Sequence, residues 1–195
     1  MSTKVILHGG FTRKKNDLNK SFFKEFLEDI KEQGTVLVVM FASRADSPQE
    51  HFESVRDMFS EHADGKVLNY EMADQEDFIK QLELSDGVYI QGGSTDKLLS
   101  ILRLYDQTEL RNSLKGKTIA GSSAGAYALA KYGASHHSSE VRPGLGIVPV
   151  RVVCHYKSSE LPPHEEATKA LEETHSDLDI IYLKDCEWEK FRVEL

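Results

Sequence analysis

Apolar residues in the first half of the chain form two kinds of stretch that follow one another in turn. Continuous apolar runs with the length of buried strands occupy residues 4–8, 35–41 and 86–90, with a weaker run at 66–69. Stretches in which apolar residues recur every three or four positions occupy residues 18–30, 75–82 and 98–102. Strands that alternate with helices in this way predict an α/β fold with a mostly parallel sheet and helices on both faces.

One further helix, over residues 48–61, is predicted by the way it starts. Ser47 is a favourable N-cap, Pro48 fits the first helical position, and Glu50 places an acid in the first turn. Gly65 then ends the connection to the next predicted strand.

Two glycine-rich turns follow predicted strands and mark the expected functional edge of the sheet. Residues 91–95 come after the run 86–90, and residues 121–125 come after the short β-branched run 117–119. An alanine-rich stretch that favours helix follows the second turn. Because open parallel sheets bind ligands at the carboxyl ends of their strands, we expect the functional residues at these turns.

The second turn, Gly121-Ser122-Ser123-Ala124-Gly125, has the pattern and setting of a nucleophile elbow. A serine hydroxyl attacks only when it stands clear of the backbone beside a base, and glycines on both sides permit the strained turn. Ser123 is therefore the candidate nucleophile. A plain flexible turn stays open as the alternative, because the bare five-residue pattern is common.

The first turn, Gln91-Gly92-Gly93-Ser94-Thr95, suits a second oxyanion donor better than a phosphate site. It has neither the lysine of a P-loop nor the three-glycine spacing of a dinucleotide fingerprint. A glycine amide at a strand end can approach a substrate carbonyl closely, while Ser94 or Thr95 caps the following helix. The alternative is an ordinary turn before a helix.

A base is needed after the serine, and His155 is the best placed of the eight histidines. It stands at the carboxyl end of the apolar run 152–156, the edge to which a parallel sheet would also bring Ser123. His136 and His137 lie in a polar loop with no further ligand spacing for a metal. Three other histidines are expected to be solvated on charged helical surfaces: His51, His62 and His175.

The acidic residue that orients the histidine is the catalytic residue that the sequence constrains least. Glu140 is the carboxylate between Ser123 and His155, so a serine, glutamate, histidine order is available. The alternative is an exposed loop acid, paired with Arg142 or with nothing.

The turn His8-Gly9-Gly10-Phe11 is similar to the oxyanion loop of esterases, but it follows the first strand, far ahead of Ser123. We interpret it as a strand-ending turn near the rim of the site.

Composition narrows the class of protein. A chain of 195 residues with 39% hydrophobic and 29% charged residues fits one globular domain over residues 1–195. A net charge of −8 argues against a nucleic-acid partner. No apolar run reaches the length of a membrane span or a signal peptide, so we expect a cytoplasmic protein. Cys154 and Cys186 have no metal spacing and are expected to be reduced thiols.

Three motifs, taken together, resemble peptidase family S51, which includes the aspartyl dipeptidase peptidase E and, more distantly, cyanophycinase. They are the elbow at 121–126, the run Gln-Gly-Gly-Ser-Thr-Asp-Lys-Leu-Leu at 91–99, and Gly-Leu-Gly-Ile-Val-Pro at 144–149 leading to Cys-His-Tyr at 154–156. The resemblance covers residues from the first strand to about Lys184. It implies a class I glutamine-amidotransferase-like fold, a flavodoxin-like three-layer sandwich, and a serine hydrolase that uses no metal or cofactor.

The resemblance also implies roles for individual residues. Ser123 becomes the nucleophile and His155 the general base, with Glu140 a neighbour of the position where the family places its acid. The glycine pair of the first turn and the residue after the nucleophile become the oxyanion hole: Gly92, Gly93 and Ala124. The substrate is expected to be a short peptide with an acidic first residue, contacted by a basic or aromatic set: Lys169, Arg142 and Tyr156. Neither a nucleic acid nor a membrane is expected as a partner, and a homodimer stays open.

The chain departs from the family pattern at three points, one of which is the acid, because Glu140 is a neighbour of the family's position and not a clean match. The first turn lacks the asparagine that usually follows its glycines, and Lys169 stands where an arginine is usual, a change that keeps charge but not geometry. An esterase of the α/β-hydrolase type and a non-catalytic amidotransferase-like binding protein remain alternatives. A cysteine-dependent amidotransferase is disfavoured because the elbow carries serine.

Overall fold

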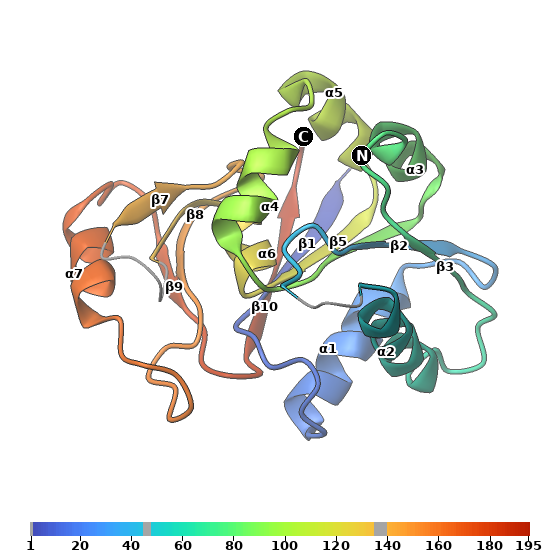
Figure 1. Ribbon diagram of the computed structural model, residues 1–195, viewed down its shortest axis with the longest axis horizontal. Coiled ribbons are helices and arrows are strands. Elements are labelled where there is room, and N and C mark those ends of the chain that lie inside the picture. Colours follow the sequence, from blue (N-terminus) through green and yellow to red (C-terminus); the bar gives the residue numbers. More distant parts are fainter. Residues whose placement is uncertain (1, 45–47, 135–139) are drawn as a thin grey trace.

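A six-stranded sheet forms the centre of the computed structural model, which describes residues 2–44, 48–134 and 140–195 (Figure 1). Its strands in spatial order are β10 (Trp188–Val193), β1 (Thr3–His8), β5 (Thr118–Ser122), β4 (Gly87–Ile90), β2 (Thr35–Val39) and β3 (Asn69–Met72). All neighbouring strands are parallel except β10, which pairs with β1 in the antiparallel sense.

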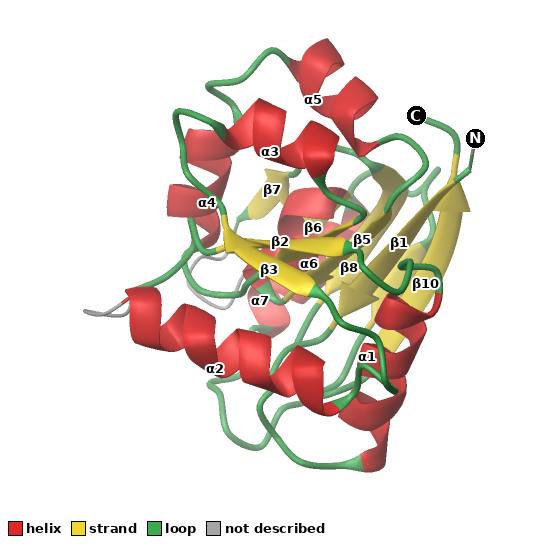
Figure 2. Cartoon of the chain, turned by 90° about the vertical axis from the view of Figure 1, so that its right-hand side faces the viewer, coloured by secondary structure: helices red, strands yellow, loops and turns green. Residues whose placement is uncertain are grey.

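Helices cover both faces of this sheet, as the alternating pattern predicts (Figure 2). One face carries α1 (Asp17–Glu28) and α2 (Pro48–Glu61); the other carries α3 (Phe78–Leu84), α4 (Thr95–Leu102), α5 (Gln107–Leu114) and α6 (Ala124–Leu129). Side chains alternate along each strand, so Val36 and Val38 pack against α1 and α2 while Leu37 and Val39 pack on the opposite face. The three-layer α/β fold is therefore confirmed.

A second, four-stranded sheet lies beside the first and was not expected from the sequence (Figure 1). Its order is β7 (Val141–Pro143), β6 (Ala130–Ala134), β8 (Val148–Val153) and β9 (Ile180–Tyr182), and α7 (Glu165–Glu173) packs against it. The alanine-rich run stops being helical at Leu129 because Ala130 to Ala134 pair with the buried, valine-rich β8. Tertiary pairing here outweighs the helix propensity of alanine.

Several predicted boundaries are displaced by a few residues. The weak strand expected at 66–69 is β3 at Asn69–Met72, and the helix expected at 75–82 is α3 at Phe78–Leu84. The predicted N-cap Ser47 lies outside the described residues, whereas Ser94 caps α4 by accepting a hydrogen bond from the amide of Lys97.

Candidate active site

Ser123 stands at the tip of a sharp turn between β5 and α6, with φ of 50° and ψ of −105°. This left-handed backbone is uncommon for a residue with a Cβ and is typical of the nucleophile elbow. A Cβ on Gly121 would lie 2.3 Å from the carbonyl carbon of Gly125, and a Cβ on Gly125 would lie 2.3 Å from the carbonyl oxygen of Ile90. Both glycines are required because the helix starts directly against two strands.

The hydroxyl of Ser123 lies within hydrogen-bonding distance of His155. Nε2 of His155 is 3.1 Å from Oγ of Ser123, and the imidazole is only 6% exposed. His155 follows β8 by two residues and has φ of 53°, so a strand of the second sheet delivers it to the end of β5. The predicted meeting of these two residues is therefore observed.

The carboxylate beside the histidine is that of Asp185, which the sequence analysis missed. Oδ1 of Asp185 lies 2.7 Å from Nδ1 of His155, and Oδ2 accepts a hydrogen bond of 2.7 Å from Oγ of Ser158. Both imidazole nitrogens are thus engaged, one by Ser123 and one by Asp185. The expectation for Glu140 is corrected, since Glu140 is exposed at the start of β7 and does not hold the Nδ1 position.

Asp185 follows β9, the parallel neighbour of β8, at its carboxyl end. The apolar residues 180–183 ahead of it are the same kind of signal that singled out His155. A search for acids after the histidine, as well as before it, would have found Asp185.

The glycines expected to form an oxyanion hole lie beside the elbow. A Cβ on Gly92 would come within 3.3 Å of the Cβ of Ser123. Gly93 has φ of +146°, and a Cβ there would lie 2.1 Å from the carbonyl oxygen of Ala42, so only glycine fits. Ala124 is the first residue of α6 and is buried. Gly92 and Ala124 therefore lie next to Ser123, and Gly93 follows Gly92 in the same turn.

Two of the residues expected to bind substrate line a cavity of about 300 Å³ beside His155. Tyr156 contributes its ring, which packs 4.6 Å from that of Tyr182, and Lys169 contributes an exposed side chain whose Nζ lies 3.9 Å from Glu173. The third, Arg142, does not line this cavity and forms an ion pair with Asp96 in the first turn of α4.

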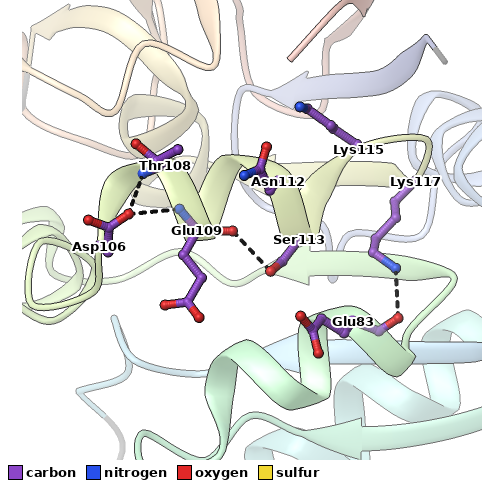
Figure 3. A pocket seen from close by; sticks show the side chains of 8 residues that line it. All are labelled: Glu83, Asp106, Thr108, Glu109, Asn112, Ser113, Lys115 and Lys117. Carbon is purple, nitrogen blue, oxygen red and sulfur yellow. Dashed lines mark hydrogen bonds between the residues drawn. The ribbon is translucent and has the colours of Figure 1, made fainter.

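A larger hollow of about 680 Å³ lies away from these residues, between α3 and α5 (Figure 3). Its polar groups complete local structure. Asp106 caps α5, Ser113 donates to the carbonyl of Glu109, and Lys117 donates to the carbonyl of Glu83. Lys117 immediately precedes β5, so this hollow is at the amino edge of the sheet, opposite the elbow.

Cys154, next to His155 in sequence, is not placed as a nucleophile. Its side chain is fully buried, with Sγ 3.8 Å from the carbonyl oxygen of Ser123, and burial raises the pKa of the thiol strongly. A thiol that stays protonated is a poor nucleophile.

The described residues contain neither a metal-ligand cluster nor a membrane-spanning helix. In residues 2–44, 48–134 and 140–195, no three side chains of histidine, cysteine, aspartate or glutamate are grouped to hold a metal ion. His136 and His137 lie outside that part of the chain. None of the described helices is both long and apolar enough to cross a bilayer.

Comparison with known proteins places the chain in a family. The sequence model of peptidase family S51 matches residues 5–192, and no curated protein matches. A crystal structure of a peptidase from an acI-B1 Actinobacterium is similar with a TM-score of 0.70 and 22% identity, covering 98% of this chain and 84% of that one. A candidate peptidase E from Listeria monocytogenes EGD-e is similar with a TM-score of 0.70 and 19% identity, covering 100% of both chains. The chain therefore belongs to peptidase family S51.

Proposed function

We propose that the protein is a serine peptidase that uses Ser123 as nucleophile, His155 as general base and acid, and Asp185 as the residue that orients His155. The observation that carries the proposal is the hydrogen-bonded line from Oγ of Ser123 through the imidazole to Asp185, built on a strained elbow. The carboxylate of Asp185 accepts a hydrogen bond from Nδ1–H of His155, so the lone pair on Nε2 faces the hydroxyl of Ser123.

The chemistry follows from this line of groups. Nε2 of His155 takes the proton of Ser123 as Oγ attacks the carbonyl carbon, and the amides of Gly93 and Ala124 stabilise the oxyanion. The protonated imidazole donates its proton to the leaving amine as the C–N bond breaks, which leaves an acyl ester on the serine. Water then attacks this ester with His155 as the base, and the carboxylic acid product leaves with Ser123 reprotonated.

The proposed substrate is a short peptide, with a dipeptide that begins with aspartate as the favoured case. The cavity of about 300 Å³ beside His155 is at the small end for ligand sites, which suits one side chain rather than a long peptide. Lys169 lines it and supplies a positive charge for a carboxylate. Its partner Glu173 is exposed and 3.9 Å away, a distance at which such pairs are weak, so a substrate carboxylate can compete.

Hydrolysis of a panel of amino-acid p-nitroanilides and dipeptides with aspartate, glutamate, leucine or lysine in first position tests the proposal. We expect the aspartyl compounds to be cleaved fastest and Ser123→Ala to abolish cleavage. Full activity in Ser123→Ala would disprove the nucleophile, and turnover of p-nitrophenyl esters without peptide cleavage would favour an esterase.

The role of Lys169 is tested separately with a matched pair of variants. Lys169→Met should raise KM for aspartyl substrates and leave leucyl substrates unaffected. Lys184→Met, which removes an exposed lysine paired with Glu187 outside the cavity, is the control. Equal kinetics for the two variants would mean that Lys169 does not bind the substrate side chain.

A further inference from the structure

The end of β1 supports the backbone of both reacting residues, although it contributes no group to the proposed chemistry. The carbonyl oxygen of His8 accepts a hydrogen bond of 2.9 Å from the amide of Ser123. The carbonyl oxygen of Gly9 accepts one of 3.1 Å from the amide of His155. One short segment therefore fixes the nucleophile and the base relative to each other.

The same segment also packs on the imidazole and holds the turn that carries the acid. A Cβ placed on Gly10 would lie 2.0 Å from Cε1 and 2.3 Å from Nε2 of His155, so the ring rests directly on the glycine backbone. The carbonyl of Gly10 accepts a hydrogen bond of 3.0 Å from the amide of Cys186, the residue after Asp185. A shift of this turn would move the ring of His155 and the backbone beside Asp185 together.

Two buried polar side chains hold the turn in place. Nδ1 of His8 accepts a hydrogen bond of 3.0 Å from the amide of Gly10, and Nε2 lies 2.9 Å from Oδ1 of Asn19 on α1. Nδ2 of Asn19 donates to the carbonyls of Phe11 (2.9 Å) and Lys14 (2.7 Å). The pair thus binds the backbone of the turn at Gly10 and Phe11, and the backbone of the following loop at Lys14.

The bonding pattern fixes the protonation of His8. Because Nδ1 accepts from an amide, the ring proton must be on Nε2, where it is donated to the Asn19 oxygen. Burial is the main cause that lowers the pKa of His8 to about 4; the bond to Asn19 opposes this effect, and the charge of His155 adds to it. His8 therefore stays neutral when His155 carries the proton during the reaction.

Burial of an imidazole and an amide is unfavourable unless each polar atom is bonded, and an apolar pair would fill the same space without that requirement. Here the two side chains bind each other, the backbone of the turn and of Lys14, and Sγ of Cys186. We infer that His8 and Asn19 are positioning residues, which hold the turn at Gly9–Phe11 so that His155 stays aligned between Ser123 and Asp185. The inference rests on the proposed function.

Three variants test it. Asn19→Leu removes the bonds to His8 and to the turn. His8→Gln keeps one acceptor and one donor and is the conservative replacement. Lys4→Met is the control, because Lys4 is equally buried at the other end of β1 and also binds α1, through the carbonyl of Glu25 (2.7 Å) and the carboxylate of Asp29 (3.0 Å).

Activity is measured per folded molecule, with the folded fraction taken from circular dichroism. Asn19→Leu should lower kcat by about 10- to 100-fold with KM little changed, since small misplacements of reacting groups have effects of this size. His8→Gln should retain most of the wild-type kcat. Lys4→Met should be less stable than the wild type but have the same kcat. If Asn19→Leu and Lys4→Met have the same kcat per folded molecule, the inference is overturned.

A readout without turnover separates this inference from the proposed function. The proton on Nδ1 of His155, 2.7 Å from the carboxylate of Asp185, is expected as a low-field resonance in the NMR spectrum. Its exchange with water should be faster in Asn19→Leu than in the wild type, and unchanged in Lys4→Met. Equal exchange in all three proteins overturns the positioning role even if Ser123-dependent hydrolysis is found. Faster exchange in Asn19→Leu alone supports it even if no peptide is cleaved.

Discussion

Oδ1 of Asp185 lies 2.7 Å from Nδ1 of His155, although α7 and β9 separate the two residues in the chain. They meet because β8 and β9 are parallel neighbours in which Val153 pairs with Tyr182. His155 lies two positions beyond the first of these partners and Asp185 three beyond the second. Adjacent parallel strands thus deliver the base and its acid to one edge.

Replacing each carboxylate in turn should show whether Asp185 or Glu140 is the acid that orients His155. We expect Asp185→Asn to lower kcat by about 10³- to 10⁴-fold, because the amide cannot hold the imidazole in the reactive tautomer. Glu140→Gln, at an exposed position, should leave kcat within a factor of about two. Steady-state hydrolysis of the best substrate measures both. A larger loss in Glu140→Gln than in Asp185→Asn would restore Glu140 as the acid.

Ser158 should matter through the carboxylate that it binds. Its hydroxyl donates a 2.7 Å bond to Oδ2 of Asp185 and accepts one of 3.2 Å from the amide of Glu160. A hydrogen bond to a charged group contributes about 1.5 kcal/mol or more, so Ser158→Ala should reduce kcat by about 10-fold. Ser100→Ala, on the exposed surface of α4, is the control. Unchanged kcat in Ser158→Ala would show that Asp185 needs no second partner.

Alanine variants of two glycines with positive φ, Gly10 and Gly65, distinguish the effect of backbone strain from the effect of contact with the imidazole of His155. Gly10 has φ of +114° and rests on His155, whereas Gly65 has φ of +90° and a Cβ there would meet nothing within 4 Å. Gly65→Ala should cost about 1 kcal/mol of stability and no activity. Gly10→Ala should inactivate the enzyme by displacing the ring, as measured by labelling of Ser123 with a serine-directed phosphonate. Equal labelling of the two variants would contradict this.

Arg151 should control the stability of α7. This buried side chain donates to the carbonyls of Leu171 (2.8 Å), Thr174 (2.9 Å) and Leu178 (2.6 Å) at and beyond the end of the helix. Arg151→Met leaves these acceptors unsatisfied and should lower the free energy of unfolding by about 3 kcal/mol. Urea denaturation measures the loss.

The exposed Arg56, which forms an ion pair only with its neighbour Asp57 among the described residues, provides the control Arg56→Met. Because α7 lines the cavity beside His155, Arg151→Met should also raise KM. A stability change as small as that of Arg56→Met would show that the hydrogen bonds of Arg151 contribute little.

The pH dependence of the free energy of unfolding should contain a contribution from the lowered pKa of His8. Burial lowers its folded pKa to about 4, from 6.5 in an unfolded chain. Between these values only the unfolded chain binds the proton, so stability falls as the pH decreases from 6.5 to 4, by up to about 3 kcal/mol. His8→Gln should lack this part of the slope. Parallel curves of unfolding free energy against pH for wild type and His8→Gln would show that His8 titrates normally.

The sequence predicts the elbow and the histidine because both depend on local signals, an apolar run that ends in a polar residue of the right type. The Ser123 and His155 positions meet as expected, and the glycines of the first turn lie beside them. Asp185 also follows an apolar run, but it comes after the base in the chain, whereas the expected serine, glutamate, histidine order places the acid before the base. Chain order does not determine which carboxylate is near, since strand pairing decides it.

The second sheet could not be predicted from residue types alone. Ala130 to Ala134 follow the alanine-rich helix α6 with no residue between them, and pairing with β7 and β8 makes them a strand. The network of His8 and Asn19 is likewise non-local: the sequence analysis places the turn at 8–11 near the rim of the site, but gives no reason to connect it with a helix residue.

The position of Asp185 and β10 after all the other site residues in the chain has a consequence during translation. A nascent chain that has been made only as far as His155 contains the nucleophile and the base but neither the acid nor the strand β10 that pairs with β1. Under the proposed mechanism its histidine has no carboxylate to orient it. Full hydrolytic activity therefore requires chain that is synthesised after both the nucleophile and the base, through β9 and Asp185.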